Sequence, residues 1–190
     1  MCGACWGAVR PLAPAPQADS KVPLVAADYS GPLRAIIHAF KYEGRRSLAR
    51  PLARLMIDAG RDQLRDAACA VPVPLHPWKR IVRGFNQAAD LASHLGPPVV
   101  QALWRVRLTR AQVGLPAAAR RRNVRGAFMA SPLLGKRRRA ACISGRVVAL
   151  VDDVRTTGAT LHECAEVLRA MGASEVRILT LAQAPAPESP

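Results

Sequence analysis

The stretch of residues 147–160, VVALVDDVRTTGAT, constrains the fold more than any other part of the chain. The apolar run Val147–Val151 is long enough for a buried strand, and Asp152 and Asp153 follow it directly. A turn with two threonines then leads through Gly158 into a segment with apolar residues at helical spacing. Ligands of open α/β sheets bind at the carboxyl ends of the strands, so this stretch predicts both a fold class and the place of a site.

Hydrophobic periodicity extends the same strand–turn–helix pattern to the rest of the chain. Apolar residues at helical spacing predict helices over 31–40, 48–59, 86–95 and 161–171, and β-branched apolar runs predict strands over 69–74, 146–152 and 176–181. Strands that are apolar throughout, each followed by a helix, indicate a parallel sheet covered on both faces. We therefore expect an α/β fold with a doubly wound core around a mostly parallel central sheet.

Composition divides the chain into four regions. Residues 1–24 are rich in proline and form an extended lead-in, and residues 25–66 form a helical segment before the first strong strand. Residues 67–184 form the core, and 185–190 form a disordered tail. No apolar stretch approaches the roughly 20 residues that a membrane span needs, and no signal sequence is evident, so we expect a soluble, cytoplasmic protein.

The charge distribution is strongly asymmetric. Lys and Arg number 28 against 13 Asp and Glu, for a formal net charge of +15, and twelve of the basic residues lie between Asp90 and Asp152, where no acidic residue occurs. Such a surface attracts nucleic acid or phosphorylated small molecules, although about half of these charges fit an ordinary solvated face. Aromatic residues make up only 4%, which argues against stacking platforms for single-stranded nucleic acid.

The residues after the strand at 147–151 suit a ribose 5-phosphate. Backbone N–H groups, threonine hydroxyls and the positive end of a helix dipole form a cradle for the phosphate, and Gly158 lets the backbone approach it closely. Asp152 and Asp153 are placed to accept hydrogen bonds from the ribose 2- and 3-hydroxyls. Paired acids after a strand are also typical of a Walker B motif, but Gly135-Lys136 lacks the upstream glycine and the hydroxyl residue of a P-loop.

This stretch resembles the phosphoribosyl pyrophosphate (PRPP) motif of type I phosphoribosyltransferases, in which two acids precede a Thr-Thr-Gly-x-Thr loop. Six further motifs resemble the ComF family, which includes the GntX-type proteins and is associated with competence for DNA uptake. They are YSGPLR from Tyr29, HAFKY from His38, VPLH from Val73, RGFNQ from Arg83, RRRN from Arg120 and GAF from Gly126. The resemblance covers roughly residues 26–183. It implies a type I phosphoribosyltransferase fold whose helical N-terminal segment acts as a hood.

The resemblance also implies roles for particular residues. Asp152 and Asp153 are the catalytic acids, and the PRPP-binding residues are Val154, Arg155, Thr156, Thr157, Gly158, Ala159 and Thr160. The loop Leu75–Arg83 holds the pyrophosphate through Leu75, His76, Lys79, Arg80 and Arg83, although Lys79 and Arg80 are equally suited to be solvated loop charges. The segment Arg107–Asn123 is the flexible loop that closes over PRPP, with Arg110, Gln112, Arg120 and Arg121. Alternatively, Arg120–Arg122 and Arg125 contact a nucleic-acid backbone.

Zinc is not expected within one chain. The ComF family commonly begins with two Cys-x-x-Cys pairs, whereas here only Cys2 and Cys5 form one, which is half of a closed zinc site. Three explanations stay open: a start codon placed too late, a decayed zinc ribbon, or a metal shared by two chains. The other cysteines, at 69, 142 and 164, do not form a disulfide framework, and we expect reduced thiols.

The expected function is transfer of the 5-phosphoribosyl group of PRPP, with Mg²⁺, to a nitrogen acceptor with release of pyrophosphate. Asp152 and Asp153 would be the only protein groups able to touch Mg²⁺. The alternative is a non-catalytic PRPP sensor, or an accessory protein of DNA uptake that binds single-stranded DNA or other uptake proteins. The acceptor and the oligomeric state, a homodimer included, stay open.

Overall fold

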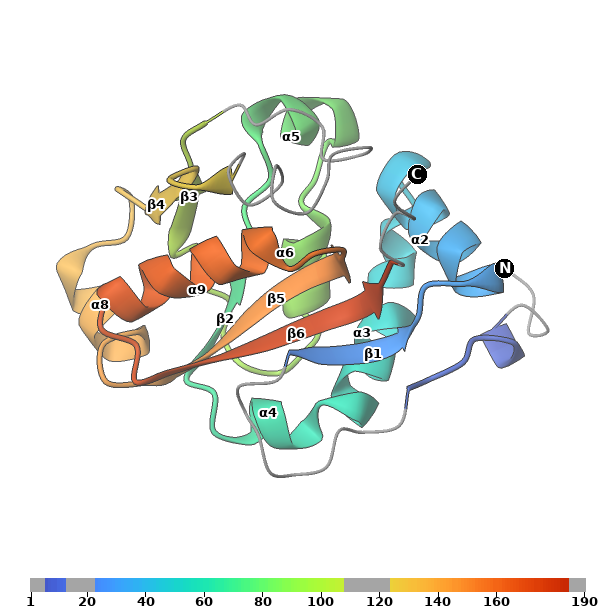
Figure 1. The fold of residues 1–190 in the computed structure, drawn as a ribbon, viewed down its shortest axis with the longest axis horizontal. Coiled ribbons are helices and arrows are strands. Elements are labelled where there is room, and N and C mark those ends of the chain that lie inside the picture. Colours follow the sequence, from blue (N-terminus) through green and yellow to red (C-terminus); the bar gives the residue numbers. More distant parts are fainter. Residues whose placement is uncertain (1–5, 13–22, 108–123, 185–190) are drawn as a thin grey trace.

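A four-stranded parallel sheet forms the centre of the computed structural model, which describes residues 6–12, 23–107 and 124–184 (Figure 1). Its strands, in the spatial order β1-β6-β5-β2, are β1 (Leu24–Asp28), β6 (Glu175–Gln183), β5 (Val147–Arg155) and β2 (Cys69–Pro72). Every neighbouring pair is parallel, so the carboxyl ends of all four strands lie along one edge. The predicted α/β fold with a parallel sheet is confirmed.

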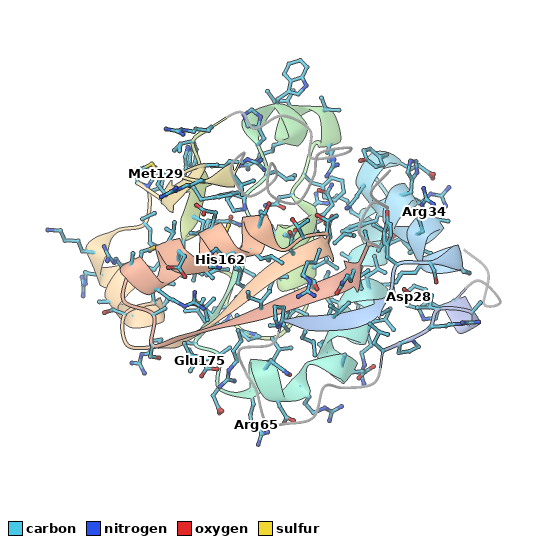
Figure 2. The ribbon with its side chains drawn as sticks, viewed as in Figure 1. Asp28, Arg34, Arg65, Met129, His162 and Glu175 are labelled. Atoms are coloured by element: carbon cyan, nitrogen blue, oxygen red, sulfur yellow. The ribbon has the colours of Figure 1, made fainter. Side chains whose placement is uncertain are left out.

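Helices cover both faces of the sheet. One face carries α2 (Gly31–Tyr42), α3 (Ala49–Ala59) and α6 (Gln87–Ala92), and the other carries α9 (Ala159–Ala170) (Figure 1). Each helix buries one apolar stripe: Leu33, Ile37 and Phe40 of α2 face the first core, and Leu161, Cys164 and Leu168 of α9 face the second. Charged side chains such as Arg34 and Arg65 point outward (Figure 2). The core is therefore doubly wound, as predicted.

The first strand was not predicted. The sequence analysis expects a helical segment over 25–66, but Leu24–Asp28 forms the edge strand β1. Its alanines have little strand propensity of their own, and the strand exists because β6 offers an edge, with Leu24 opposite Leu179 and Asp28 opposite Gln183. The rest of the segment is helical, with the short helices η1 (Arg46–Leu48) and α4 (Arg61–Arg65) beside α2 and α3.

The prediction of a loop over Leu75–Arg83 is wrong for most of these residues, because Pro77–Arg83 forms the helix α5. Proline favours the first helical turn, where its missing N–H leaves no hydrogen bond unmade. Nδ1 of His76 accepts a hydrogen bond from the Trp78 N–H at 3.1 Å, and Gly84, with φ of +74°, ends the helix in the left-handed conformation. Only residues 73–76 connect β2 to this helix.

A second, antiparallel sheet was also not predicted. It pairs β3 (Leu103–Arg105) with β4 (Phe128–Ala130), and α8 (Lys136–Cys142) follows it. Strands of three residues are too short to show a hydrophobic period. Between them lies the segment expected to be a flexible loop; its residues Arg110, Gln112, Arg120 and Arg121 fall outside the described residues, as do Cys2 and Cys5.

The central motif is confirmed with shifted boundaries. The prediction ends the strand at Asp152 and begins the turn at Val154, but β5 continues to Arg155. The extension follows from its neighbour, because β6 pairs with Val154 through Ala182 and with Arg155 through Gln183. The two acids therefore lie among the last residues of a paired strand rather than in a loop.

Candidate functional site

The turn after β5 forms a polar cradle at the start of α9. Thr156–Gly158 join the strand to the helix, and Gly158 has φ of +75°, which glycine adopts without strain. The Thr157 hydroxyl is buried and has no hydrogen-bond partner among the residues that the structure describes. Because the first N–H groups of a helix also lack partners within the helix, the cradle is suited to an anion such as a phosphate.

The two acids leave β5 on opposite faces of the sheet. Core residues of this strand alternate between the two sides, Val148 and Leu150 toward α9 and Ala149 and Val151 toward α2 and α3. This alternation carries Asp152 toward α9 and Asp153 toward α2. Their backbones are fixed locally: Asp152 Oδ1 accepts a hydrogen bond from the Asp153 N–H at 2.9 Å, and Asp153 Oδ1 accepts one from the Val154 N–H at 2.6 Å.

Lys41 belongs to the site although the sequence analysis assigns it no role. Its Nζ lies 2.9 Å from Asp153 Oδ2, and the two side chains are only 15% and 12% exposed. Lys41 is near the end of α2, whereas Asp153 ends β5, so no local pattern in the sequence relates them. The available signal was its place in the HAFKY motif that begins at His38.

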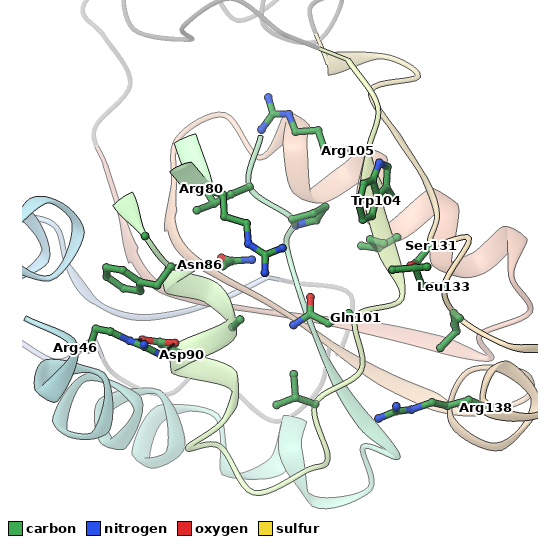
Figure 3. Close-up of a pocket in the computed structure, with 18 residues that line it drawn as sticks. Arg46, Arg80, Asn86, Asp90, Gln101, Trp104, Arg105, Ser131, Leu133 and Arg138 are labelled. Carbon is green, nitrogen blue, oxygen red and sulfur yellow. Dashed lines mark hydrogen bonds and ion pairs between the residues drawn. The ribbon is translucent and has the colours of Figure 1, made fainter. Parts of the chain in front are cut away.

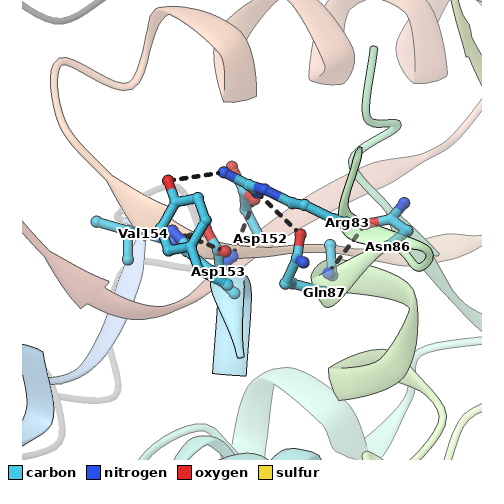
Figure 4. Close-up of polar contacts among 9 residues, drawn as sticks. Arg83, Asn86, Gln87, Asp152, Asp153 and Val154 are labelled. Carbon is cyan, nitrogen blue, oxygen red and sulfur yellow. Dashed lines mark hydrogen bonds and ion pairs between the residues drawn. The ribbon is translucent and has the colours of Figure 1, made fainter. Parts of the chain in front are cut away.

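Arg83 lies beside this ion pair, as the close-up in Figure 4 shows. Its guanidinium group donates to Gln87 Oε1 and to the Tyr42 hydroxyl, both at 3.0 Å, and it stacks over the Tyr42 ring at 4.8 Å. Gln87 is 1% exposed, and its Nε2 has no partner within the described part of the chain. Helices α2, α5 and α6 therefore all contribute polar groups around the acids at the end of β5.

Burial and a neighbouring charge set the protonation of Asp152. Burial, first, and the negative charge of Asp153, second, raise the pKa of Asp152 to about 7, against the opposing effects of its hydrogen bond with the Asp153 backbone and of the Lys41 and Arg105 charges. For Lys41, burial lowers the pKa, but the ion pair with Asp153 outweighs it and the pKa is raised overall. Lys41 is thus paired with Asp153, while Asp152 retains a proton to near neutral pH.

This arrangement predicts a pH dependence of stability. Asp152 keeps its proton up to about pH 7 in the folded state but releases it near its ordinary pKa of 3.8 when unfolded. Between these values the folded state binds more protons, so the contribution of Asp152 to stability is greatest at acid pH and falls as pH rises through the window. In the wild type, the free energy of unfolding should fall by on the order of 1 kcal/mol per pH unit across this window because of Asp152, and Asp152→Asn should remove this slope. Urea unfolding between pH 4.5 and 7.5 measures it. Asp58→Asn on the exposed face of α3 is the control, and an equal change in slope for both variants would contradict the prediction.

The structure separates the residues that were predicted to hold the pyrophosphate. Arg83 joins the polar network beside the acids, whereas Leu75 and Arg80 line a cavity of about 760 Å³ on the β2 side of the sheet (Figure 3). His76 caps α5, and the side chain of Lys79 falls outside what the structure describes. None of the residues 152–160 lines this cavity.

Within the described ranges 6–12, 23–107 and 124–184, no cluster of three or more His, Cys, Asp or Glu residues is arranged to hold a metal ion. Cys69, Cys142 and Cys164 are free thiols, and burial raises the pKa of Cys69 to about 12. The described helices include none that is both long and apolar enough to span a membrane.

Comparison with known proteins places these features in a family. Residues 82–190 match the family model of the phosphoribosyl transferase domain. The chain is 36% identical over 193 residues to Competence protein F of Haemophilus influenzae, covering 96% of this chain and 78% of that protein, and 33% identical over 168 residues to DNA utilization protein YhgH of Escherichia coli K12, covering 83% and 70%. Among solved structures, the allosteric regulatory enzyme of purine biosynthesis aligns with a TM-score of 0.47 and 21% identity, over 76% of this chain and 30% of that one.

The match to the domain model includes both acids and the whole turn after β5, whereas Lys41 and its helix lie outside it. The similarity to Competence protein F extends over nearly the whole chain and so includes α2 as well. The parallel sheet, the acid pair at its carboxyl edge and these two matches agree with one another. The chain belongs to the ComF family and carries a phosphoribosyl transferase domain.

Proposed function

We propose that the chain binds PRPP with Mg²⁺ and transfers the 5-phosphoribosyl group to a nitrogen acceptor. One observation supports this above all: the paired acids meet the Thr157 hydroxyl, which has no hydrogen-bond partner in the described part of the chain, at the carboxyl end of β5. A ribose 5-phosphate presents an anion at one end and two neighbouring hydroxyls in the middle, which these groups match. The match to the phosphoribosyl transferase domain supports the same ligand class.

In the proposed reaction the bond from the anomeric carbon to pyrophosphate breaks and a bond to the acceptor nitrogen forms. The acceptor nitrogen loses its proton to water, and pyrophosphate leaves with the bonding electrons. Asp152 and Asp153 accept hydrogen bonds from the ribose hydroxyls and stabilise the positive charge that develops on the sugar. The turn Thr156–Thr160 holds the 5-phosphate, and the Arg83 guanidinium group pairs with the pyrophosphate.

Mg²⁺ fits this site as a partner of the substrate rather than of a protein cage. Among the described residues no group of three or more metal-ligating side chains forms a cage, and Mg²⁺ commonly binds through one or two carboxylates plus substrate phosphates. Asp152 is the better candidate of the two, because Asp153 is already paired with Lys41. When bound, the ion would neutralise charge on the pyrophosphate.

Thr157→Val tests the phosphate cradle. Because the Thr157 hydroxyl makes no hydrogen bond to a described residue, its loss should leave the free energy of unfolding nearly unchanged. The same change should weaken binding of Mg²⁺-PRPP and of ribose 5-phosphate by about tenfold or more, since a hydrogen bond to a charged group is lost. Calorimetric titration and urea unfolding measure the two quantities.

Thr180→Val is the matched control for this test. The buried Thr180 hydroxyl donates to the Leu24 carbonyl at 2.9 Å, so this variant should lose about 1 kcal/mol of stability while PRPP affinity is retained. Equal affinity of wild type and Thr157→Val would refute the cradle. If folded wild-type protein does not bind PRPP at all, the proposed function fails as a whole.

A second candidate function is a non-catalytic accessory role in DNA uptake that involves single-stranded DNA. It is favoured by the printed names of the relatives, a competence protein and a DNA utilization protein, and by the acid-free basic stretch between Asp90 and Asp152. Binding of a fluorescent oligothymidylate should then weaken steeply as salt rises from 50 to 200 mM. No binding at 50 mM salt removes this candidate.

A further inference from the structure

The cavity of about 760 Å³ beside β2 is lined by neither Arg83, the two acids nor the turn Thr156–Thr160, which are the residues that carry the proposed phosphoribosyl transfer. It lies between the start of α6, the chain at Val99–Gln101 and the sheet of β3 and β4 (Figure 3). Its size falls within the range of about 300–1,000 Å³ that is usual for small-molecule sites. The cavity meets the segment after β2 at Leu75 and Arg80, and the acids and the turn after β5 lie outside it.

The cavity carries a large excess of positive charge. Its lining includes the four arginines Arg46, Arg80, Arg105 and Arg138, which come from four different elements, and a single carboxylate, Asp90. That carboxylate is already occupied, because Arg46 donates to both of its oxygens at 2.7 and 2.8 Å. Arg80 and Arg138 form no ion pair with any residue that the structure describes. Two guanidinium groups, those of Arg80 and Arg138, therefore lie in this cavity without a counter-ion among the described residues, and such an arrangement favours an anionic ligand.

The same cavity also offers a flat apolar surface and a neutral hydrogen-bonding group. Trp104 on β3 lines the wall and remains 42% exposed, which is unusual for the largest side chain. Gln101 and Arg80 extend toward the middle of the cavity (Figure 3). An indole ring next to arginine and an amide suits a planar heterocycle joined to a phosphate.

We propose that this cavity is a separate binding site for a free 5′-nucleotide. Its phosphate pairs with Arg138 or Arg80, its base stacks on Trp104, and the Gln101 amide hydrogen-bonds to the base or sugar. The site goes beyond the proposed phosphoribosyl transfer, because it neither uses the acid pair nor requires that PRPP bind. It also differs in kind from a surface that tracks a DNA strand, since its volume suits a single nucleotide.

The test uses two pairs of matched variants and 5′-AMP as the probe. Arg138→Ala is compared with Arg137→Ala, its neighbour on α8, which carries the same charge but does not line the cavity. Trp104→Leu is compared with Trp78→Leu, an exposed tryptophan on α5 that also lies outside the lining. Binding is followed by calorimetry and by quenching of tryptophan fluorescence, and each variant is also titrated with Mg²⁺-PRPP.

Arg138→Ala should weaken AMP binding by about tenfold or more and Trp104→Leu by at least about fivefold. Both controls should bind AMP as wild type does, and only Trp104→Leu should abolish the quenching. Adenosine and inorganic phosphate, each half of the ligand, should bind far more weakly than AMP. Arg138→Ala should leave PRPP affinity unchanged, so the nucleotide site and the proposed function can succeed or fail separately.

Three results would overturn the proposal. If Arg137→Ala and Arg138→Ala weaken AMP binding equally, the effect comes from the general positive charge of the surface and not from the cavity. Loss of AMP binding in an Asp152→Asn, Asp153→Asn variant would place the nucleotide in the phosphoribosyl site instead. Binding of an oligothymidylate without binding of AMP or TMP would show a strand-binding surface and no free-nucleotide site.

Discussion

Replacing Asp152 and Asp153 together by asparagine is expected to abolish measurable binding of Mg²⁺-PRPP to a chain that remains folded. Each carboxylate offers a charge-assisted hydrogen bond to a ribose hydroxyl, and such bonds contribute about 1.5–3 kcal/mol each. Losing both amounts to about 3–6 kcal/mol, or more than 100-fold in affinity. Asparagine keeps the shape of the side chain, so the loss reports charge and hydrogen bonding rather than packing.

The matched control is the Asp58→Asn, Asp62→Asn variant. It removes the same two charges from exposed positions on α3 and α4, where both acids pair with arginines on their own surface. Calorimetric titration should show wild-type affinity for this control, and circular dichroism should show that both double variants are folded. Unchanged binding in the Asp152, Asp153 variant would place PRPP elsewhere on the molecule.

Lys41→Met is expected to destabilise the fold by about 3 kcal/mol, because it leaves the Asp153 carboxylate buried without its counter-ion. The ion pair is worth measuring because Lys41 comes from a helix outside the match to the phosphoribosyl transferase domain. Urea unfolding at pH 7.5 gives the free energy directly. Asp153→Asn in the Lys41→Met background should recover part of the loss, since the unpaired charge is then removed.

Lys136→Met provides the comparison for that prediction. Lys136 opens α8, is exposed and forms no ion pair with a described residue, so its replacement should change stability by less than about 0.5 kcal/mol. If Lys41→Met and Lys136→Met cost the same, the contact between Lys41 and Asp153 contributes nothing to the folded state.

The sequence predicted those parts of the molecule that local pattern determines. The apolar run at Val147–Val151 and the stripe of Leu161, Cys164 and Leu168 identified β5 and α9, and Asn86 caps α6 where a helix start was expected. The turn between β5 and α9 was predicted nearly in place. These features depend on residues within a few positions of one another, which is the range over which hydrophobic period and capping act.

The features that were missed depend on distant partners. β1 is a strand because β6 lies beside it, and β5 extends past Asp152 for the same reason. Lys41 joins the site through a contact with Asp153, and no spacing along the chain relates the two. The α5 helix was missed for a different reason: the family resemblance implied a loop over Leu75–Arg83, although a proline in the first turn is compatible with a helix.

The pairing of β1 with β6 has a consequence for the order in which the protein assembles. The Thr180 hydroxyl reaches the Leu24 carbonyl across 156 residues of chain, so the first strand of the sheet can be completed only by the last. During synthesis on the ribosome, Leu24–Asp28 emerges early and waits without its neighbour until β6 has left the exit tunnel. Closing so long a loop is slow, and the waiting apolar edge is open to other chains. We therefore expect docking of β1 to be a late step in folding. Until that step, chaperones have to keep the unpaired strand from associating with other chains.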